Sequence, residues 1–173
     1  MLSNTVQSII HQYDFNLAYT EELVKDVSDA QICIQPAIGL VNHPAFTIGH
    51  LITGSALTAK YLGAAFEIPE GWEDLFLRKG PGDPRLPEKD SSLYPKKAEL
   101  IRELKHQHEK VKKLLSATSH DILLAEKKWR YSNFMPKLID CIHFMCVTHE
   151  AMHLGQLAAW RRALNMDSAL KKL

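Results

Sequence analysis

Four segments of the sequence repeat apolar residues at the spacing of an α-helix, and no segment alternates polar and apolar residues as a strand would. The segments cover residues 4–27, Asn42 to Gly63, 96–117, and about Pro136 to Met166. This pattern predicts an all-α fold, because each apolar stripe must be buried against another helix. At 173 residues the chain has the length of one domain, so we expect a single helical domain over residues 1–173.

Local signals mark the ends of these segments. Asn42 is a candidate cap for the second helix, with Pro44 tolerated in the first turn, and Gly63 suits the left-handed position beyond its end. Acidic and basic residues interleave along the third segment, which is typical of a solvated face, so we place His106 and His108 on the surface. The fourth segment is apolar nearly all round, which predicts a central helix or a subunit contact.

The connection between the second and third segments, residues 63–94, is unusually long and rich in glycine and proline. Most connections in compact domains have about 4–6 residues. A connection of this length can run along a bundle, so that the helices it joins lie parallel. It can also cover a site, with Trp72, Leu75 and Phe76 as its apolar contacts. Trp129, Tyr131 and Phe134, just before the fourth segment, are assigned to the core at the end of the bundle, the alternative being an aromatic box for a substrate.

Charge and cysteine content narrow the class of protein. The 21 basic and 20 acidic residues give a net charge of +1 and form no basic block, so nothing indicates a nucleic acid or an anionic membrane as partner. Acidic residues precede any apolar stretch long enough for a signal peptide or a membrane span. Cys33, Cys141 and Cys146 lack paired spacing, which favours buried, reduced thiols and a cytoplasmic location.

The stretch THEAMHLGQ, residues 148–156, carries the most chemical information. His149 and His153 are four residues apart, so on a helix they share one face with Cβ atoms about 5–6 Å apart. Two imidazoles so placed can bind one metal ion at about 2.0–2.1 Å. At about 100° per residue, Gln156 and Trp160 lie within roughly 20° of His149, whereas Arg161 falls on the far side, so this face points to the core. A buried imidazole without a partner is unfavourable, and a metal would satisfy both rings.

The motif alone leaves alternatives open. Nine histidines in 173 residues give about 0.5 such pairs by chance, and about 0.03 when a glutamate must follow the first histidine. Hydrogen-bonded core histidines are therefore the competing interpretation. Glu150 is a candidate general base or outer partner of the metal, the alternative being a salt bridge at the bundle edge. Gln156 is a candidate to orient a ligand or a metal-bound water, the alternative being a hydrogen bond to a neighbouring helix.

A zinc protease is the first function that HEAMH suggests, with Glu150 as the base, but the rest of the chain argues against it. The residues after His153 include no histidine, Asp167 is their only carboxylate, and Ala159 stands where a metzincin would place its third histidine. A protease also needs a strand edge or cleft that holds an extended peptide, and no strand is predicted.

A third ligand is then expected upstream, and His50 is the best candidate. It lies in the middle of the second segment, beside Phe46, Leu57 and Tyr61 on one apolar face. Three histidines with an open fourth position form the pattern of a catalytic rather than a structural zinc site. A core histidine bonded to a neighbouring carbonyl is the alternative for His50.

Three runs of the chain, NHPAFTIGHLITGSALTAKYLG, LYPKKAELIRELKHQHEKV and THEAMHLGQLAAWRRALNM, resemble the DinB-like superfamily in order and spacing. The resemblance extends from the first helix to the last. It implies an up-down-down-up four-helix bundle, often dimeric, with metal ligands at His50, His149 and His153. Members of the family include bacillithiol- and mycothiol-type S-transferases and a mycothiol-dependent maleylpyruvate isomerase.

The function expected from this resemblance is a metal-dependent S-transferase that joins a low-molecular-weight thiol to a small electrophile. The metal would bind the thiol at its open position and lower the thiol pKa. Zinc and nickel are the first candidates, although three imidazoles also accept iron or copper. A metal-dependent hydrolase and a non-catalytic, stress-linked metal- or ligand-binding module are the alternatives. A homodimer is expected from the apolar fourth segment and from the family.

Overall fold

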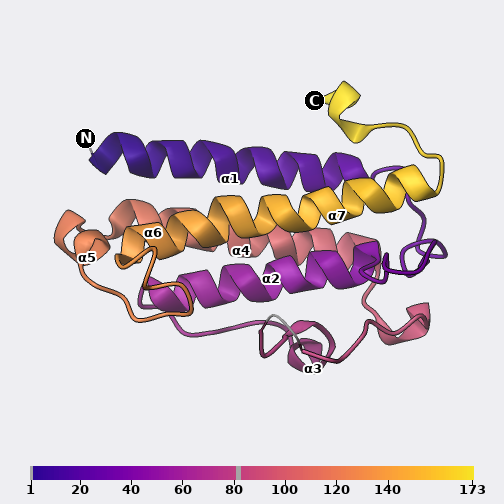
Figure 1. Cartoon of the computed structure of the whole chain (residues 1–173), viewed down its shortest axis with the longest axis horizontal. Helices are drawn as coiled ribbons and strands as arrows, with labels where there is room; N and C mark the ends of the chain where they lie inside the picture. The colour runs from indigo at the N-terminus through magenta and orange to yellow at the C-terminus, as the bar shows by residue number, and fades with distance from the viewer. Residues whose placement is uncertain (1, 81–82) are drawn as a thin grey trace.

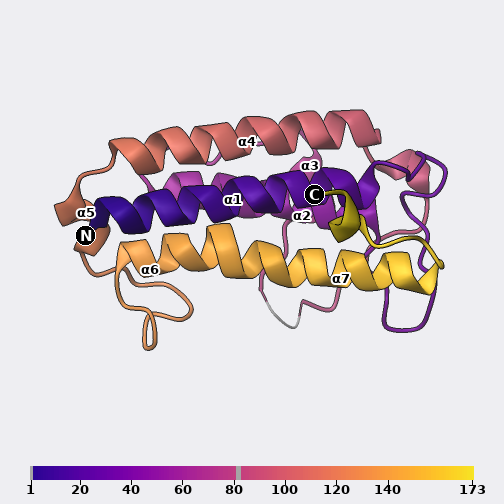
Figure 2. The ribbon, with the colours of Figure 1, turned by 90° about the horizontal axis from the view of Figure 1, so that it is seen from above.

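The computed structural model describes residues 2–80 and 83–173, and this part of the chain is all-helical without strands. Four long helical stretches lie side by side (Figures 1 and 2). They are α1 (Leu2–Val24), α2 (Pro44–Tyr61), α4 (Lys97–Ala117), and the consecutive α6 (Leu138–His143), η2 (Phe144–His149) and α7 (Glu150–Ala163). The short elements are α3 (Trp72–Phe76), η1 (Ser91–Leu93), α5 (His120–Leu124) and η3 (Ala169–Lys172). All four predicted helical segments are confirmed, with ends shifted by a few residues.

Apolar stripes from these helices form the core. On α4, Leu100, Leu104, Val111 and Leu115 recur at helical spacing and are almost fully buried. Burial of each such side chain contributes about 1.5–3 kcal/mol relative to leaving it exposed. The last helix is less enclosed than expected, because Met152 on α7 is 60% exposed. One face of α7 is therefore open to solvent, and this face carries part of the candidate site.

The long crossover contacts the core through α3, as predicted. Phe76 is fully buried, and Trp72 and Leu75 pack against the same cluster. The Phe76 ring fits only because residue 49 is glycine, since a Cβ there would lie 2.2 Å from Cδ1 of the ring. The crossover then leads to α4, which begins at the end of the molecule where α2 begins (Figure 1). This path fixes the main chain of α3 against the middle of α2.

The cap of α2 differs from the prediction. His43, not Asn42, is the N-cap, and its Nδ1 accepts a hydrogen bond from the Phe46 amide at 3.2 Å. A neutral imidazole nitrogen can accept this bond as an asparagine oxygen would. The other ring nitrogen, Nε2, donates to the carbonyl of Glu88 at 2.8 Å. The prediction for Gly63 is confirmed, since its φ is +96°.

We expect this cap to make the protein sensitive to acid. His43 is fully buried, and burial lowers its pKa to about 4, below the unfolded value of about 6.5. The unfolded chain therefore binds more protons in this window, and stability falls as the pH drops from about 6.5 through about 4. His43→Asn keeps the cap acceptor but not the titration. In urea denaturation of metal-free protein, the free energy of unfolding should fall by about 2 kcal/mol more for the wild type than for this variant between pH 7 and pH 5. If the free energy of unfolding changed equally with pH in the two proteins, His43 would not be the source of the acid sensitivity.

No helix in the described part of the chain is long and apolar enough to span a membrane. Cys33, Cys141 and Cys146 are buried and free, as predicted. Burial raises the pKa of Cys141 to about 12, so this thiol stays protonated at neutral pH. The same holds for Cys146, whose pKa is also raised by burial. These cysteines therefore act as small core residues.

Candidate metal centre

The structure brings His50, His149 and His153 together. One ring nitrogen of each lies within 4.8 Å of the other two, and Nε2 of His149 is 3.2 Å from Nε2 of His153. Two nitrogens bound to one tetrahedral zinc at about 2.0–2.1 Å would be about 3.3 Å apart. The three rings come from α2, the end of η2 and α7, so helices distant in sequence build the cluster.

His50 is oriented by a hydrogen bond from its Nδ1 atom to the crossover, on the side of the ring away from the cluster. Its Nδ1 lies 3.1 Å from the carbonyl oxygen of Phe76, to which it donates. This bond fixes the tautomer in which Nε2 carries the free lone pair. The insertion of Phe76 against Gly49 thus positions the carbonyl that orients His50. Both predicted environments of His50 are combined here, because the ring bonds a carbonyl with one nitrogen and faces the cluster with the other.

His153 is oriented in a similar way by Gln156. Its Nδ1 lies 3.3 Å from Oε1 of Gln156, which also accepts a hydrogen bond from Nδ2 of Asn42 at 3.1 Å. With Nδ1 as the donor, Nε2 of His153 is free to bind a metal. Gln156 is therefore at the cluster, as predicted, and it also bonds the segment before α2. Asn42, predicted as a cap, serves here as the partner of Gln156.

His149 ends the π-helical segment η2, which the sequence did not indicate. Wide π turns are frequent at functional sites and leave carbonyls to be satisfied by other groups. Nδ2 of Asn16 on α1 donates to the carbonyls of Cys146 at 3.1 Å and Val147 at 3.3 Å. The imidazole itself lies against Gly54 of α2, where a Cβ would be only 3.3 Å from its Cε1 atom. Glycine thus allows the close approach of η2 to α2.

The electrostatics of the cluster favour neutral imidazoles. Burial and the neighbouring histidines lower the pKa of His149 to about 3, and burial lowers that of His153 to about 4. Burial also lowers the pKa of His50. At neutral pH the three imidazoles are therefore unprotonated, and each can offer a nitrogen lone pair to a ligand at the centre of the cluster. A divalent cation satisfies all three at once, so the residues fit a metal ion.

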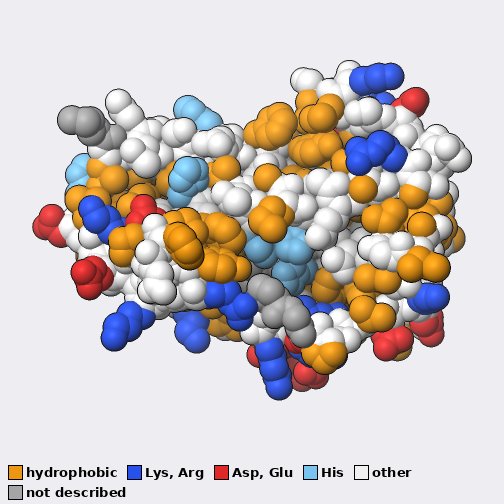
Figure 3. All heavy atoms as spheres, in the orientation of Figure 1, with side chains coloured by type: hydrophobic (Ala, Val, Ile, Leu, Met, Phe, Trp, Pro, Cys, Tyr) orange, Lys and Arg blue, Asp and Glu red, His pale blue; other side chains and the backbone are white. Residues whose placement is uncertain are grey.

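The cluster is half-buried and open on one side. Figure 3 shows histidine side chains in the middle of the face formed by α7 and α2. Beside them stands an aromatic group in which Phe144 lies 5.5 Å from Trp129, 5.2 Å from Tyr131 and 6.3 Å from His149, between ring centroids. These rings are half-buried, and Phe134 is 88% exposed, so the prediction of a bundle-end core is wrong. Trp129 and Tyr131 instead pack against Phe144 in an aromatic wall, and Phe144 is the member of this wall that lies next to His149.

Glu150 is not brought to the histidine cluster. It points into the interior between the helices, where its Oε1 lies 3.0 Å from Nε2 of His108 on α4. His108 stacks on Tyr13 at 3.6 Å between ring centroids, and Tyr13 bonds Ser55 at 2.7 Å. Burial raises the pKa of Glu150. The predicted alternative was a salt bridge at the edge of the bundle, whereas Glu150 makes a hydrogen-bonded contact with His108 in the interior, which is an ion pair only when the imidazole is protonated.

The surface position predicted for His108 is wrong, because the side chain is fully buried. Leu104, Val111 and Leu115 share its helix face, and this stripe is the signal that would have placed it inside. The dense charges of α4 concealed the stripe. His106 is exposed, as predicted.

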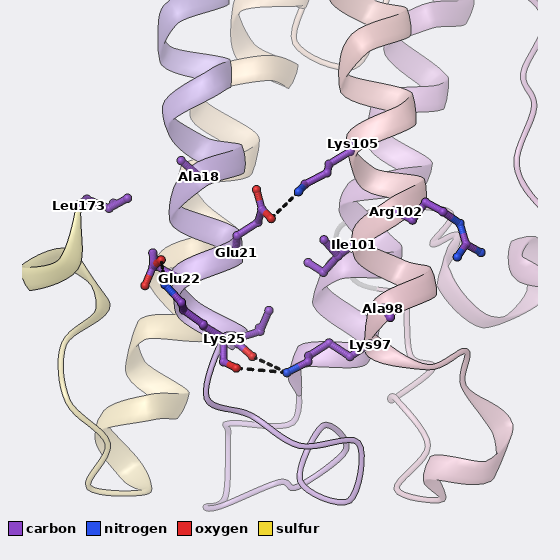
Figure 4. Close-up of a pocket in the computed structure, with 11 residues that line it drawn as sticks. Ala18, Glu21, Glu22, Lys25, Lys97, Ala98, Ile101, Arg102, Lys105 and Leu173 are labelled. Atoms are coloured by element: carbon purple, nitrogen blue, oxygen red, sulfur yellow. Dashed lines mark hydrogen bonds and ion pairs between the residues drawn. The ribbon is translucent and has the colours of Figure 1, made fainter.

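A separate groove of about 740 Å³ lies between α1 and α4 (Figure 4). An ion pair between Lys105 and Glu21 at 2.6 Å crosses it. At its end, Nζ of Lys97 donates to the carbonyls of Val24 and Lys25 at 3.1 and 3.3 Å. None of the three clustered histidines lines this groove. The groove is therefore not part of the metal centre.

Fold and site together define an all-helical protein with a half-open three-histidine cluster. The sequence matches the DinB superfamily over residues 12–157, and the chain belongs to this superfamily. No match to the chain was found among the curated proteins or among the solved structures.

Proposed function

We propose that the protein is an up-down-down-up four-helix bundle that binds one divalent metal ion, zinc or nickel, through His50, His149 and His153. The observation that carries this proposal is the convergence of three ring nitrogens within 4.8 Å of one another. It is supported by the outer partners, Phe76 and Gln156, which hold Nδ1 of two rings and leave Nε2 free. The common starting end of α2 and α4 supports the bundle topology (Figure 1).

We further propose that the protein is an S-transferase that joins a low-molecular-weight thiol to a small electrophile. A bound metal would supply an open coordination position that lowers the pKa of a thiol. His50 and His153 are held in one tautomer by their partners, so the cluster needs little reorganisation. Phe144 lies 6.3 Å from His149 between ring centroids and offers apolar contact to a small electrophile, and Tyr131 packs against Phe144.

The two residues predicted to act in catalysis have different support. Gln156 contacts His153, and we assign it the role of orienting this ligand. Glu150 faces His108 in the interior, so its predicted role as a base rests on the motif alone. A homodimer, a cytoplasmic location and a link to stress stay predictions.

The test is turnover of 1-chloro-2,4-dinitrobenzene by the zinc- or nickel-loaded protein, with and without cysteine as the thiol. In the expected reaction the thiolate sulfur bonds the ring carbon and chloride leaves, which is followed by absorbance above the spontaneous rate. His153→Ala is the matched control and should return the rate to that background. Turnover of p-nitrophenyl acetate without thiol would instead identify the hydrolase. A metal-loaded protein that is inactive with both reporters would favour the non-catalytic module.

A further inference from the structure

Arg78 lies next to the histidine cluster, although no pattern in the sequence marks it as a functional residue. It follows α3 by two residues, and the carbonyl of Phe76 on α3 holds His50. The guanidinium carbon of Arg78 is 4.4 Å from the centroid of the Phe46 ring. The Phe46 ring is stacked on His50 at 5.7 Å with an interplanar angle of 12°. After burial, the charge of Arg78 is a further cause of the lowered pKa of His50, which agrees with this proximity.

The guanidinium of Arg78 has no acidic partner within residues 2–80 and 83–173. Its Nη1 donates to the carbonyls of Leu75 at 3.2 Å and Leu77 at 3.4 Å. No acceptor among the described residues bonds the edge formed by Nε and Nη2. This edge has the two parallel donors that bind a carboxylate in fork geometry.

The nearby acid, Asp83, is already neutralised by another residue. Its carboxylate accepts from Nε of Arg85 at 3.0 Å and from Nη2 of the same side chain at 2.7 Å. The backbone amide of Lys79 also donates to it, at 2.9 Å. Asp83 therefore pairs directly with Arg85, and its charge acts on Arg78 only from a distance, while burial and the charge of Arg85 lower the pKa of Arg78. A partly buried charge without a counter-ion is unfavourable unless a ligand supplies one.

Further positive charge surrounds this position. Lys79 is exposed, and Nη2 of Arg130 lies 3.5 Å from its carbonyl oxygen. Arg130 comes from the segment of the aromatic wall, so the wall and the crossover meet beside the site. Basic side chains are visible near the histidine patch in Figure 3. Such a rim raises the local concentration of anionic ligands.

We propose that Arg78 binds a carboxylate group of the substrate while the reacting sulfur of that substrate lies at the histidine cluster. The substrate class is therefore a small carboxylic acid, and Arg78 is its specificity determinant. This inference rests on the proposed function and deepens it. Stacking on Phe46 restricts the guanidinium plane, so the free edge is held in place before the ligand arrives.

The test uses cobalt-substituted protein and pairs of thiols that differ only in charge. The probes are 3-mercaptopropionate, 4-mercaptobutyrate and 6-mercaptohexanoate, each compared with its neutral amide, and binding is followed by the thiolate-to-cobalt charge-transfer absorption. For at least one chain length, the acid should bind about tenfold more tightly than the amide, because a charge-assisted bidentate pair is formed. Arg78→Met should abolish this preference and leave the affinity for the amide unchanged.

Two further variants separate the effect of the fork geometry from the effect of positive charge alone. Arg78→Lys keeps the charge without the fork and should retain only part of the preference. Arg130→Met removes a nearby charge and should change the preference by no more than about twofold, since an exposed rim charge contributes little. Equal binding of acids and amides by the wild type, or a preference that survives Arg78→Met, would overturn the role of Arg78 alone. Absence of the charge-transfer band with every thiol would overturn the proposed function, and this inference with it.

Discussion

Replacing His153 with alanine is expected to reduce the metal content of the protein from about one ion per chain to near zero. The loss should exceed the roughly 10- to 100-fold weakening that follows removal of an outer partner of a ligand. His153 is half-buried on the open face of α7, so its truncation leaves the core intact. Elemental mass spectrometry on untagged protein gives the metal content, and circular dichroism verifies the helical fold.

The controls for this prediction lie on the same helical stretch. His143→Ala removes an exposed histidine of α6 and should leave the metal content unchanged. Gln156→Ala should weaken binding by about 10- to 100-fold without abolishing it, because only the orientation of His153 is lost. His50→Ala and His149→Ala should behave as His153→Ala does. A wild type that takes up no ion, even after incubation with zinc and nickel salts, would make the cluster a set of core histidines.

The features that were predicted from the sequence are those that depend on local spacing. The helical segments follow from apolar periodicity, and their ends from residues such as Pro44 and Gly63, whose backbone preferences act locally. The pairing of His149 with His153 is also local, because one helical turn brings them together. His50 is distant in sequence, and its place in the cluster came from its helix face and from the family resemblance.

The features that were missed depend on contacts between distant segments. The π turn of η2 has its carbonyls bonded by Asn16 from α1, a partner that no local pattern indicates. The choice of His43 over Asn42 as the cap depends on the Glu88 carbonyl, which the crossover brings to the imidazole. Arg78 has no direct acidic partner among the described residues because the nearby Asp83 is paired with Arg85. In each case the residue type alone does not indicate a role, and the role depends on a contact with a residue distant in sequence.

The largest effect on stability is expected from Glu150→Ala. Glu150 is 3% exposed and its partner His108 is fully buried, so the substitution leaves a buried imidazole without its acceptor. An unsatisfied buried donor costs about 1–3 kcal/mol, and the cavity left by the truncated side chain adds to this cost. Because Nδ1 of His108 already has no hydrogen-bond partner among the described residues, the remaining ring has no local compensation. Urea denaturation of metal-free wild type and variant at pH 7 measures the difference.

Related substitutions separate the pair from other effects. Glu150→Gln keeps an oxygen that can accept from His108 and should cost only about 1 kcal/mol. The double substitution His108→Leu with Glu150→Leu should be more stable than Glu150→Ala, since an apolar pair needs no hydrogen bonds. Glu109→Ala, at an exposed site on α4, should stay within about 0.5 kcal/mol of the wild type. If Glu150→Ala were as stable as the wild type but inactive in thiol transfer, Glu150 would be the base that the HEAMH motif predicts rather than a structural partner of His108.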